Sequence, residues 1–262
     1  MMDSLRLFLT YVRLNVVNEL QYRVNFWTNL LESAISLVIA LGGMGVVFSH
    51  TDNLAGWRPP QLLALVGVYF LMLGFIHVFV EPSMERLLQE IRLGTLDFML
   101  TKPRDSQFLV SIRRISLWRL VEMVAGVVIL VIATVQMQLS ISAAQLALFL
   151  FMLLLGGVIV YSFWLMLATT AFWFVKVDNI LVIFQSAYSA GRWPVNIYPQ
   201  MMRMLLTFLV PVAFAVTIPA EALVGRLSLQ NFLLALALSI GMFMLARWYW
   251  RIGARRYSGA SA

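Results

Sequence analysis

The chain has 262 residues, of which 61% are hydrophobic and 12% are charged, and its formal net charge is +7. Soluble domains are about half apolar and about a quarter charged, so this composition excludes a soluble protein and predicts that lipid covers part of the surface. The basic residues lie at the ends of apolar runs, where they face headgroups and cytosol rather than nucleic acid. The absence of cysteine excludes disulfides and thiol chemistry.

Residues 1–25 predict an amphipathic helix that lies in the membrane interface. The alternative is that this segment forms the polar end of the first spanning helix. On a helix its apolar and polar side chains separate into two faces, Leu5, Phe8, Leu9, Val12 and Val16 against Asp3, Arg6, Thr10 and Arg13.

Five long apolar runs follow, each near the roughly 20 residues that cross a bilayer as a helix. They cover about 27–48, 61–81, 119–137, 143–172 and 231–250. The stretch 176–222 is less regular, and we expect a helix over 179–192 and then a proline-broken re-entrant hairpin over 193–222 that enters from the outer face. The alternative is a cytoplasmic segment over 176–199 and a true span over 200–219. Either way, the sequence predicts an all-α integral membrane protein of about six transmembrane helices in a single domain, 1–262.

The positions of Lys and Arg predict the orientation. With both termini in the cytoplasm, the outer segments contain few of the 19 Lys and Arg residues, namely Arg58, Arg192, Arg203 and Arg226. The reverse topology would invert this bias, so we expect cytoplasmic termini and a cytoplasmic loop over 82–118.

This cytoplasmic loop is the most informative stretch of the sequence. Residues 83–93 predict a short helix of mixed charge that Gly94 can end. Apolar Leu96, Met99 and Leu100 follow, and Pro103 closes the segment. A loop with apolar residues among charges indicates a docking surface; the alternative is an ordinary solvated loop.

The segment Arg92-x-Gly94-Thr95-Leu96-Asp97-x-x-Leu100-x-x-Pro103 resembles the signature Gly-Thr-Leu-Glu/Asp…Leu…Pro of ABC permeases of the type-two exporter class. In that family the signature lies between the second and third helices, as it does here, and forms the coupling helix that docks on the ATPase subunit. The resemblance therefore implies a set of ATPase-coupling residues: Glu90, Arg92, Gly94, Thr95, Asp97, Leu100 and Pro103.

A second match lies before the last helix. Several prolines and a glutamate look like the family's re-entrant hairpin and imply a gate there: Pro194, Pro199, Pro211, Pro219 and Glu221. Met201-Met202 departs from the pattern, because many relatives carry an aromatic–leucine pair at this place.

The resemblance implies a transmembrane subunit of an ATP-driven exporter in a bacterial plasma membrane. Such a subunit pairs with a second permease, identical or homologous, and the substrate crosses at their interface while two ATPase subunits bind below. We find no GxxxxGK[ST] motif, so we expect no ATP site and no cofactor in this chain, and ATP and Mg would be bound by the partner ATPase. No catalytic set is present, so we expect no enzyme; the alternative function is a stand-alone secondary transporter or channel.

Four ionisable residues fall within or beside the apolar runs. Glu32 and Glu122 are expected near the inner face, where they can pair with a basic neighbour or have a function. His77 and Glu81 lie on one helical face and can pair. Glycines are expected to let helices approach closely within the chain: Gly42, Gly43, Gly45, Gly156 and Gly157.

Overall fold

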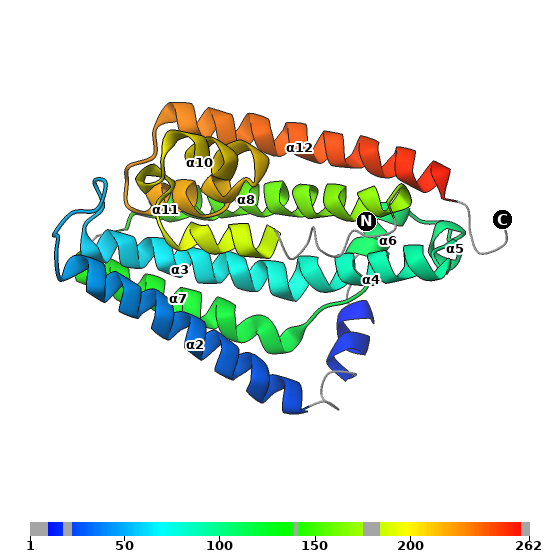
Figure 1. Cartoon of the computed structure of the whole chain (residues 1–262), viewed down its shortest axis with the longest axis horizontal. Helices are drawn as coiled ribbons and strands as arrows, with labels where there is room; N and C mark the ends of the chain where they lie inside the picture. The colour runs from blue at the N-terminus through cyan, green and yellow to red at the C-terminus, as the bar shows by residue number, and fades with distance from the viewer. Residues whose placement is uncertain (1–9, 18–22, 139–140, 175–183, 258–262) are drawn as a thin grey trace.

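The computed structural model describes residues 10–17, 23–138, 141–174 and 184–257. The helices predicted over 1–25 and 179–192 therefore lie partly outside the described residues. Within them, 10–17 and 184–188 are helical and Ser189–Arg192 form a 3₁₀ turn. The described part is all-α, as predicted: long helices lie side by side and no β-strand occurs among these residues (Figure 1).

Among the described residues, five helical stretches are long and apolar enough to cross a membrane, or up to six if a bent pair of helices counts as one span. The chain is thus a multi-pass membrane protein. The stretches are Trp27–Phe48 of α2 (Arg23–Phe48), α3 continued by α4 (Pro59–Leu93), α7 with its leading turn (Leu117–Gln136), α8 with its trailing turn (Ala143–Phe172) and α12 (Leu229–Arg256).

The second span does not end near residue 81, where a loop was expected. α3 (Pro59–Phe75) passes through a π-helical turn (Ile76–Val80) directly into α4 (Glu81–Leu93). Pro82 has no N–H to donate to the carbonyl of Val78, and the backbone N–H of Ser116 donates to that oxygen instead at 3.0 Å. This bond satisfies the carbonyl that Pro82 leaves without a helical donor.

The continuous helix is longer than a bilayer requires. Its 35 residues span about 52 Å at 1.5 Å per residue, whereas the hydrocarbon core is about 30 Å thick. About 20 Å of helix therefore extends beyond the apolar core. Residues 82–93 are a rigid extension of the membrane span.

α3 is the central helix, and α7 packs closely along it. A Cβ at Gly126 of α7 would lie 2.5 Å from the backbone nitrogen of Leu71 and 2.8 Å from the carbonyl oxygen of Gly67. Gly156 of α8 makes an equally close contact with the carbonyl of Phe214, at 2.8 Å. Only glycine allows these approaches.

The prediction that the α2 glycines make close contacts is wrong for Gly42 and Gly45. A Cβ at either position would meet no described atom within 4 Å. These two positions therefore face away from the chain's own helices.

The segment before the last helix is a bent helix pair. Gln200–Leu209 comprises α10 (Gln200–Met204) and a π-helical turn, Ala213–Leu223 comprises a π-helical turn and α11 (Ile218–Leu223), and the two arms meet at 77°.

Both ends of this pair lie toward the end of the bundle that holds residues 49–58, which we call the Trp57 end. The carbonyl of Leu223 accepts a hydrogen bond from Gln145 Nε2 at 2.6 Å, at the start of α8. Before the first arm, the Trp193 ring lies 3.6 Å from the Cβ position of Gly43, near the end of α2. These contacts favour the re-entrant arrangement over a complete span.

Candidate functional site

The helix α4 ends in a compact tip, residues 93–104, which we call the Gly94 tip. Gly94 has φ 67° and its N–H donates to the carbonyl of Ile91 at 3.4 Å, while the N–H of Thr95 donates to the carbonyl of Glu90 at 3.0 Å. This pair of bonds is a Schellman motif, whose left-handed residue is usually glycine. The predicted helix end at Gly94 is confirmed.

The apolar side chains of the tip divide into an inner and an outer set. Leu96 and Met99 are buried, so they form the interior of the tip rather than a surface patch. Leu93 and Phe98 are instead 71% and 75% exposed. The tip thus presents two large apolar side chains, which the sequence motif did not single out.

Glu90 lies inside the structure and not on the predicted docking surface. Its side chain is 4% exposed and accepts hydrogen bonds from Arg86 Nε, at 3.0 Å, and from Arg113 Nη1. Glu90 therefore ties α4 to the segment that returns from the tip.

The other predicted coupling residues lie on or near the tip surface. Leu100 is half-buried and packs against the core. The remaining ones are exposed: Arg92, Thr95, Asp97 and Pro103. Asp97 begins the single-turn helix α5 (Asp97–Leu100). A negatively charged carboxylate at a helix N-terminus is stabilising.

The last helix holds the tip from the other side. α12 and the residue after it form four hydrogen bonds with residues 96–106. Leu96 N–H donates to Tyr257 Oη at 3.2 Å, Trp250 Nε1–H donates to Ser106 Oγ at 3.2 Å, and Arg247 donates to both carboxylate oxygens of Asp105, with Nη1 2.8 Å from Oδ1. The tip is therefore held by α4 on one side and by contacts with the end of the chain after α12 on the other.

Asp105 has two roles at the start of α6 (Ser106–Ser111). Its Oδ1 accepts from the N–H of Phe108 at 2.9 Å, which caps the helix. The hydrogen bond from Arg247 holds the pKa of Asp105 below its usual value because it stabilises the charged carboxylate.

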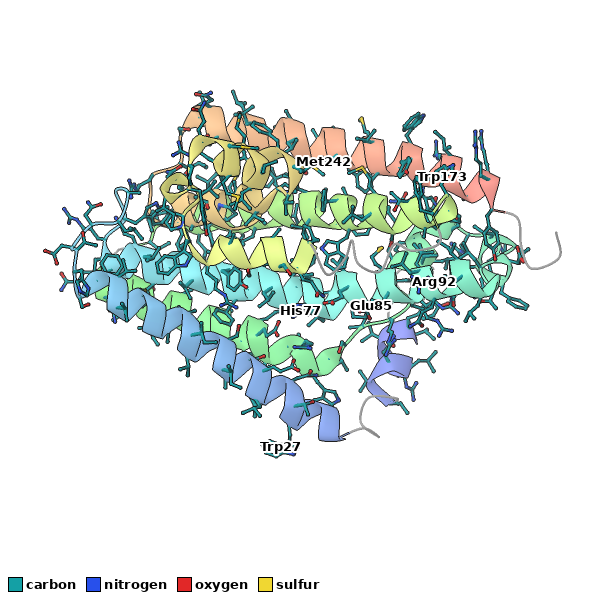
Figure 2. The ribbon with its side chains drawn as sticks, viewed as in Figure 1. Trp27, His77, Glu85, Arg92, Trp173 and Met242 are labelled. Atoms are coloured by element: carbon teal, nitrogen blue, oxygen red, sulfur yellow. The ribbon has the colours of Figure 1, made fainter. Side chains whose placement is uncertain are left out.

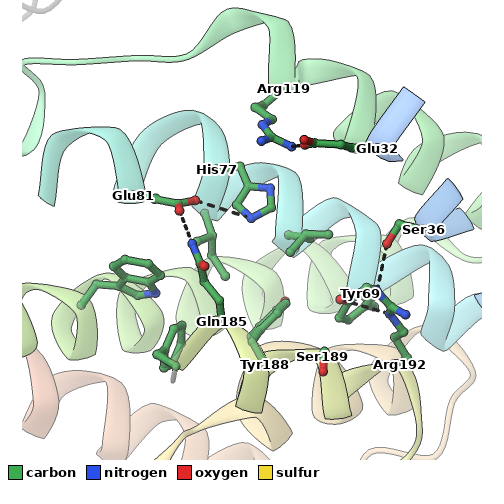
Figure 3. A pocket seen from close by; sticks show the side chains of 14 residues that line it. Glu32, Ser36, Tyr69, His77, Glu81, Arg119, Gln185, Tyr188, Ser189 and Arg192 are labelled. Atoms are coloured by element: carbon green, nitrogen blue, oxygen red, sulfur yellow. Dashed lines mark hydrogen bonds and ion pairs between the residues drawn. The ribbon is translucent and has the colours of Figure 1, made fainter. Parts of the chain in front are cut away.

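A polar cavity of about 310 Å³ lies between α2, the continuous helix of α3 and α4, the turn Leu117–Arg119 before α7, α8 and the segment 184–192 (Figure 3). Its wall combines aromatic rings with charged side chains. The charged and imidazole groups are Glu32, His77, Glu81, Arg119 and Arg192.

At one side of this cavity, Glu122 of α7 is fully enclosed by partners. Its side chain is 3% exposed, and its Oε2 lies 2.7 Å from His77 Nδ1. Its Oε1 accepts from Ser33 Oγ at 3.2 Å and from Arg119 Nη1 at 3.3 Å. Arg119 also pairs with Glu32 at 3.0 Å, so both carboxylates have the basic neighbour that the sequence allowed.

The predicted pairing of His77 with Glu81 is present: Nε2 and Oε2 are 3.5 Å apart. The second oxygen of Glu81 accepts from Gln185 Nε2. The π-helical turn places His77 between two carboxylates, and such turns are frequent at functional sites.

Arg192 is half-buried and contacts both α2 and α3. Its Nη2 donates to Ser36 Oγ at 2.9 Å and its Nε to Tyr69 Oη at 3.3 Å. The guanidinium carbon also lies 5.5 Å from the centre of the Tyr69 ring, which stacks on Tyr188. Nothing in the sequence pairs position 192 with position 36.

None of the predicted gate residues lines the cavity. Among the described residues Pro194 is buried, Pro199 is exposed before α10, Pro211 lies at the bend and Pro219 lies in the second arm. Glu221 accepts from Asn231 Nδ2 at 3.1 Å, which joins the hairpin to α12.

Residues 30–261 match the sequence model of a family described as "ABC-2 family transporter protein". The chain belongs to this family. The match covers all the described spans except the first residues of α2, and it includes the whole Gly94 tip, so the chain is an ABC-2 type permease, the membrane component of an ABC transporter. No curated protein and no solved structure matches it.

Proposed function

We propose that this ABC-2 permease is the transmembrane subunit of an ATP-driven exporter and that separate P-loop ATPase subunits dock on its Gly94 tip. The observation that carries this proposal is the exposed pair Leu93 and Phe98 at the end of a braced, continuous helix. Exposed aromatic and aliphatic side chains on a rigid scaffold are typical anchors of protein interfaces.

ATP binding by the partner would move the tip, and the tip would transmit this motion along α4 into α3. Hydrogen bonds to α12 would carry the same motion to the last span. A second permease, identical or homologous, would complete the substrate path and cover apolar side chains that this chain leaves exposed on α2, among them Leu31, Ile35, Val38 and Val46.

The docking test is co-purification with a P-loop ATPase encoded beside this chain. We expect a stable complex with the wild type and with Phe98→Leu, and an association at least about 30-fold weaker with Phe98→Ser, since interface hot spots cost about 2 kcal/mol or more. A complex that Phe98→Ser leaves intact would refute docking at the tip. Absence of any complex would favour the stand-alone transporter.

The orientation is tested with single-cysteine variants, because the chain has no cysteine of its own. We propose that the Gly94 tip faces the cytoplasm and the Trp57 end faces outward across a bacterial inner membrane. A membrane-impermeant maleimide added to intact spheroplasts should label Asp52→Cys and not Phe98→Cys. The opposite labelling pattern would invert the topology.

A further inference from the structure

An apolar groove of about 370 Å³ lies along α8, between the packed pair α3 and α7 on one side and α12 on the other. Its wall includes Leu71 and Phe75 of α3, Met123 of α7, Leu154 of α8 and Phe243 of α12. Leu154 and Phe243 are 62% and 44% exposed, so the groove opens on the outer surface of the bundle, which lipid covers. We call it the Leu154 groove.

A second cavity, of about 400 Å³, continues the Leu154 groove, because Tyr161 and Phe243 line both. Figure 2 shows α8 between α3 and α12, with Met242, the neighbour of Phe243, labelled on α12. The rest of the wall of the second cavity is mostly polar: Asp105, Gln107, Phe108, Ser111 and Arg247. The two cavities therefore form one slot, apolar at one end and polar at the other.

Hydrogen bonds fix the shape of the polar end. Tyr161 Oη accepts from Gln107 Nε2 at 3.1 Å and lies 2.7 Å from Ser111 Oγ. Arg247 Nη1 donates to Gln107 Oε1 at 2.9 Å and to Asp105 Oδ1 at 2.8 Å. These bonds join α6 and the residue before it to α8 and α12, so the wall does not depend on a ligand for its shape.

The slot changes from apolar to polar near the depth where a bilayer does. Both α8 and α12 begin at the Trp57 end, where Gln145 and Arg226 donate to backbone carbonyls of neighbouring segments. At 1.5 Å per residue, Tyr161 lies about 27 Å along α8 from its first residue, and Arg247 lies equally far along α12. Because the hydrocarbon core is about 30 Å thick, both residues lie near its boundary on the side of the Gly94 tip.

The polar end carries an excess of positive charge. Asp105 is paired with Arg247, and Arg251 follows one turn later on the same exposed face of α12. Arg251 is near enough to Asp105 for its positive charge to lower the pKa of that carboxyl. Two guanidinium groups thus lie beside one carboxylate, at the level where lipid phosphates lie.

We infer that the slot binds one anionic phospholipid of the surrounding bilayer as a resident lipid. One acyl chain occupies the Leu154 groove, and the phosphate lies beside Arg251 and Arg247, since guanidinium groups bind phosphate through paired N–H donors. A lipid fits better than a protein segment, because the slot and the bilayer change polarity at the same depth. The volumes of both cavities are within the range of ligand sites.

This lipid site is separate from the proposed function. The slot lies on another side of α3 from the polar cavity of Figure 3, with which it shares no wall residue. A resident lipid there would join the α3–α7 pair to α8 and α12 and would stabilise the folded permease by mass action. No transport step and no ATPase contact is needed for binding.

The test is native mass spectrometry of the full-length, delipidated permease in detergent, titrated with dioleoyl phosphatidylglycerol. We expect one lipid to bind at lower concentration than all later ones. Dioleoyl phosphatidylcholine, with the same chains and no net charge, should bind about fivefold more weakly at this site, a modest factor because Arg251 is exposed to water. Absence of a distinct first lipid would overturn the site, and equal affinity for the two lipids would overturn the anionic headgroup.

Two pairs of variants locate the site. Leu154→Trp fills the groove and should weaken binding by at least about tenfold, whereas Leu150→Trp, one turn earlier and 54% exposed but outside the groove, should not. Arg251→Gln should remove the preference for phosphatidylglycerol, whereas Arg256→Gln, on the opposite face of α12 from Arg247, should keep it. Unchanged binding by Leu154→Trp, or equal losses within either pair, would overturn the assignment.

A wild-type experiment covers the case in which a variant does not fold. Phosphatidylglycerol with a diazirine in one acyl chain is irradiated with the permease in nanodiscs, and the labelled peptides are sequenced. We expect label on α8 and α12 around Leu154 and Phe243 that unlabelled phosphatidylglycerol displaces. Label spread evenly over the lipid-facing helices would overturn a resident lipid, and a permease dimer that excludes the label from these peptides would assign the groove to the second permease instead.

Discussion

The substitution Glu90→Gln should loosen the Gly94 tip while leaving the spans intact. The Glu90 side chain is 4% exposed, and its partners Arg86 and Arg113 are 46% and 26% exposed. Hydrogen bonds to charged groups contribute about 1.5–3 kcal/mol when buried, but the half-exposed Arg86 contributes little. Because glutamine keeps one acceptor oxygen, we expect a loss of about 2 kcal/mol, mostly from the Arg113 contact.

Hydrogen exchange of the amides of residues 94–104 measures this loss. If the tip opens as a unit, 2 kcal/mol corresponds to about 30-fold faster exchange, with no change in the amides of α3. Glu85→Gln is the matched control on the exposed face of the same helix and should change exchange by less than about 0.5 kcal/mol. Equal effects of the two variants would refute the role of Glu90 as a brace.

Gly94→Ala should lower the stability of the tip by about 1 kcal/mol, because Gly94 has φ 67°. Thermal unfolding measures this loss, and Gly241→Ala is the control because a Cβ there meets nothing within 4 Å. Gly126→Ala should lower the melting temperature by forcing α3 and α7 apart, whereas Gly42→Ala, on an open face, should not. The lowered pKa of Asp105 means that its contribution to stability is full above its usual pKa, near 4, and is lost as pH falls through the lower folded value. Asp105→Asn keeps the helix cap and should remove this part of the acid dependence of unfolding.

The spans and the end of α4 could be predicted because their signals are local. Hydropathy over about 20 residues locates a span, and glycine after a mixed-charge helix indicates a left-handed cap. The hydrogen bond from Ser116 to the carbonyl of Val78, where the helix continues through Pro82, could not be predicted, because it joins distant parts of the chain.

The sequence predicted the helix end at Gly94, but it predicted neither the packing of the tip nor the polar cavity. The Gly94 motif identified the tip, yet Glu90 is a buried brace because Arg113 returns to it, and Phe98 is exposed because Leu96 and Met99 occupy the interior. The contact of Arg192 with Ser36 could not be predicted, because the two residues are far apart in the chain. Whether the coupling and gate residues act as proposed stays a prediction.

Cross-linking from the tip tests the central claim most directly. In the cysteine-free chain, Phe98→Cys and the control Asp52→Cys each carry one thiol-reactive photo-cross-linker, and the permease is irradiated in membranes with the neighbouring ATPase. We predict a covalent permease–ATPase product from position 98 and none from position 52. No product from position 98, or equal products from both positions, would contradict docking of the ATPase on the Gly94 tip.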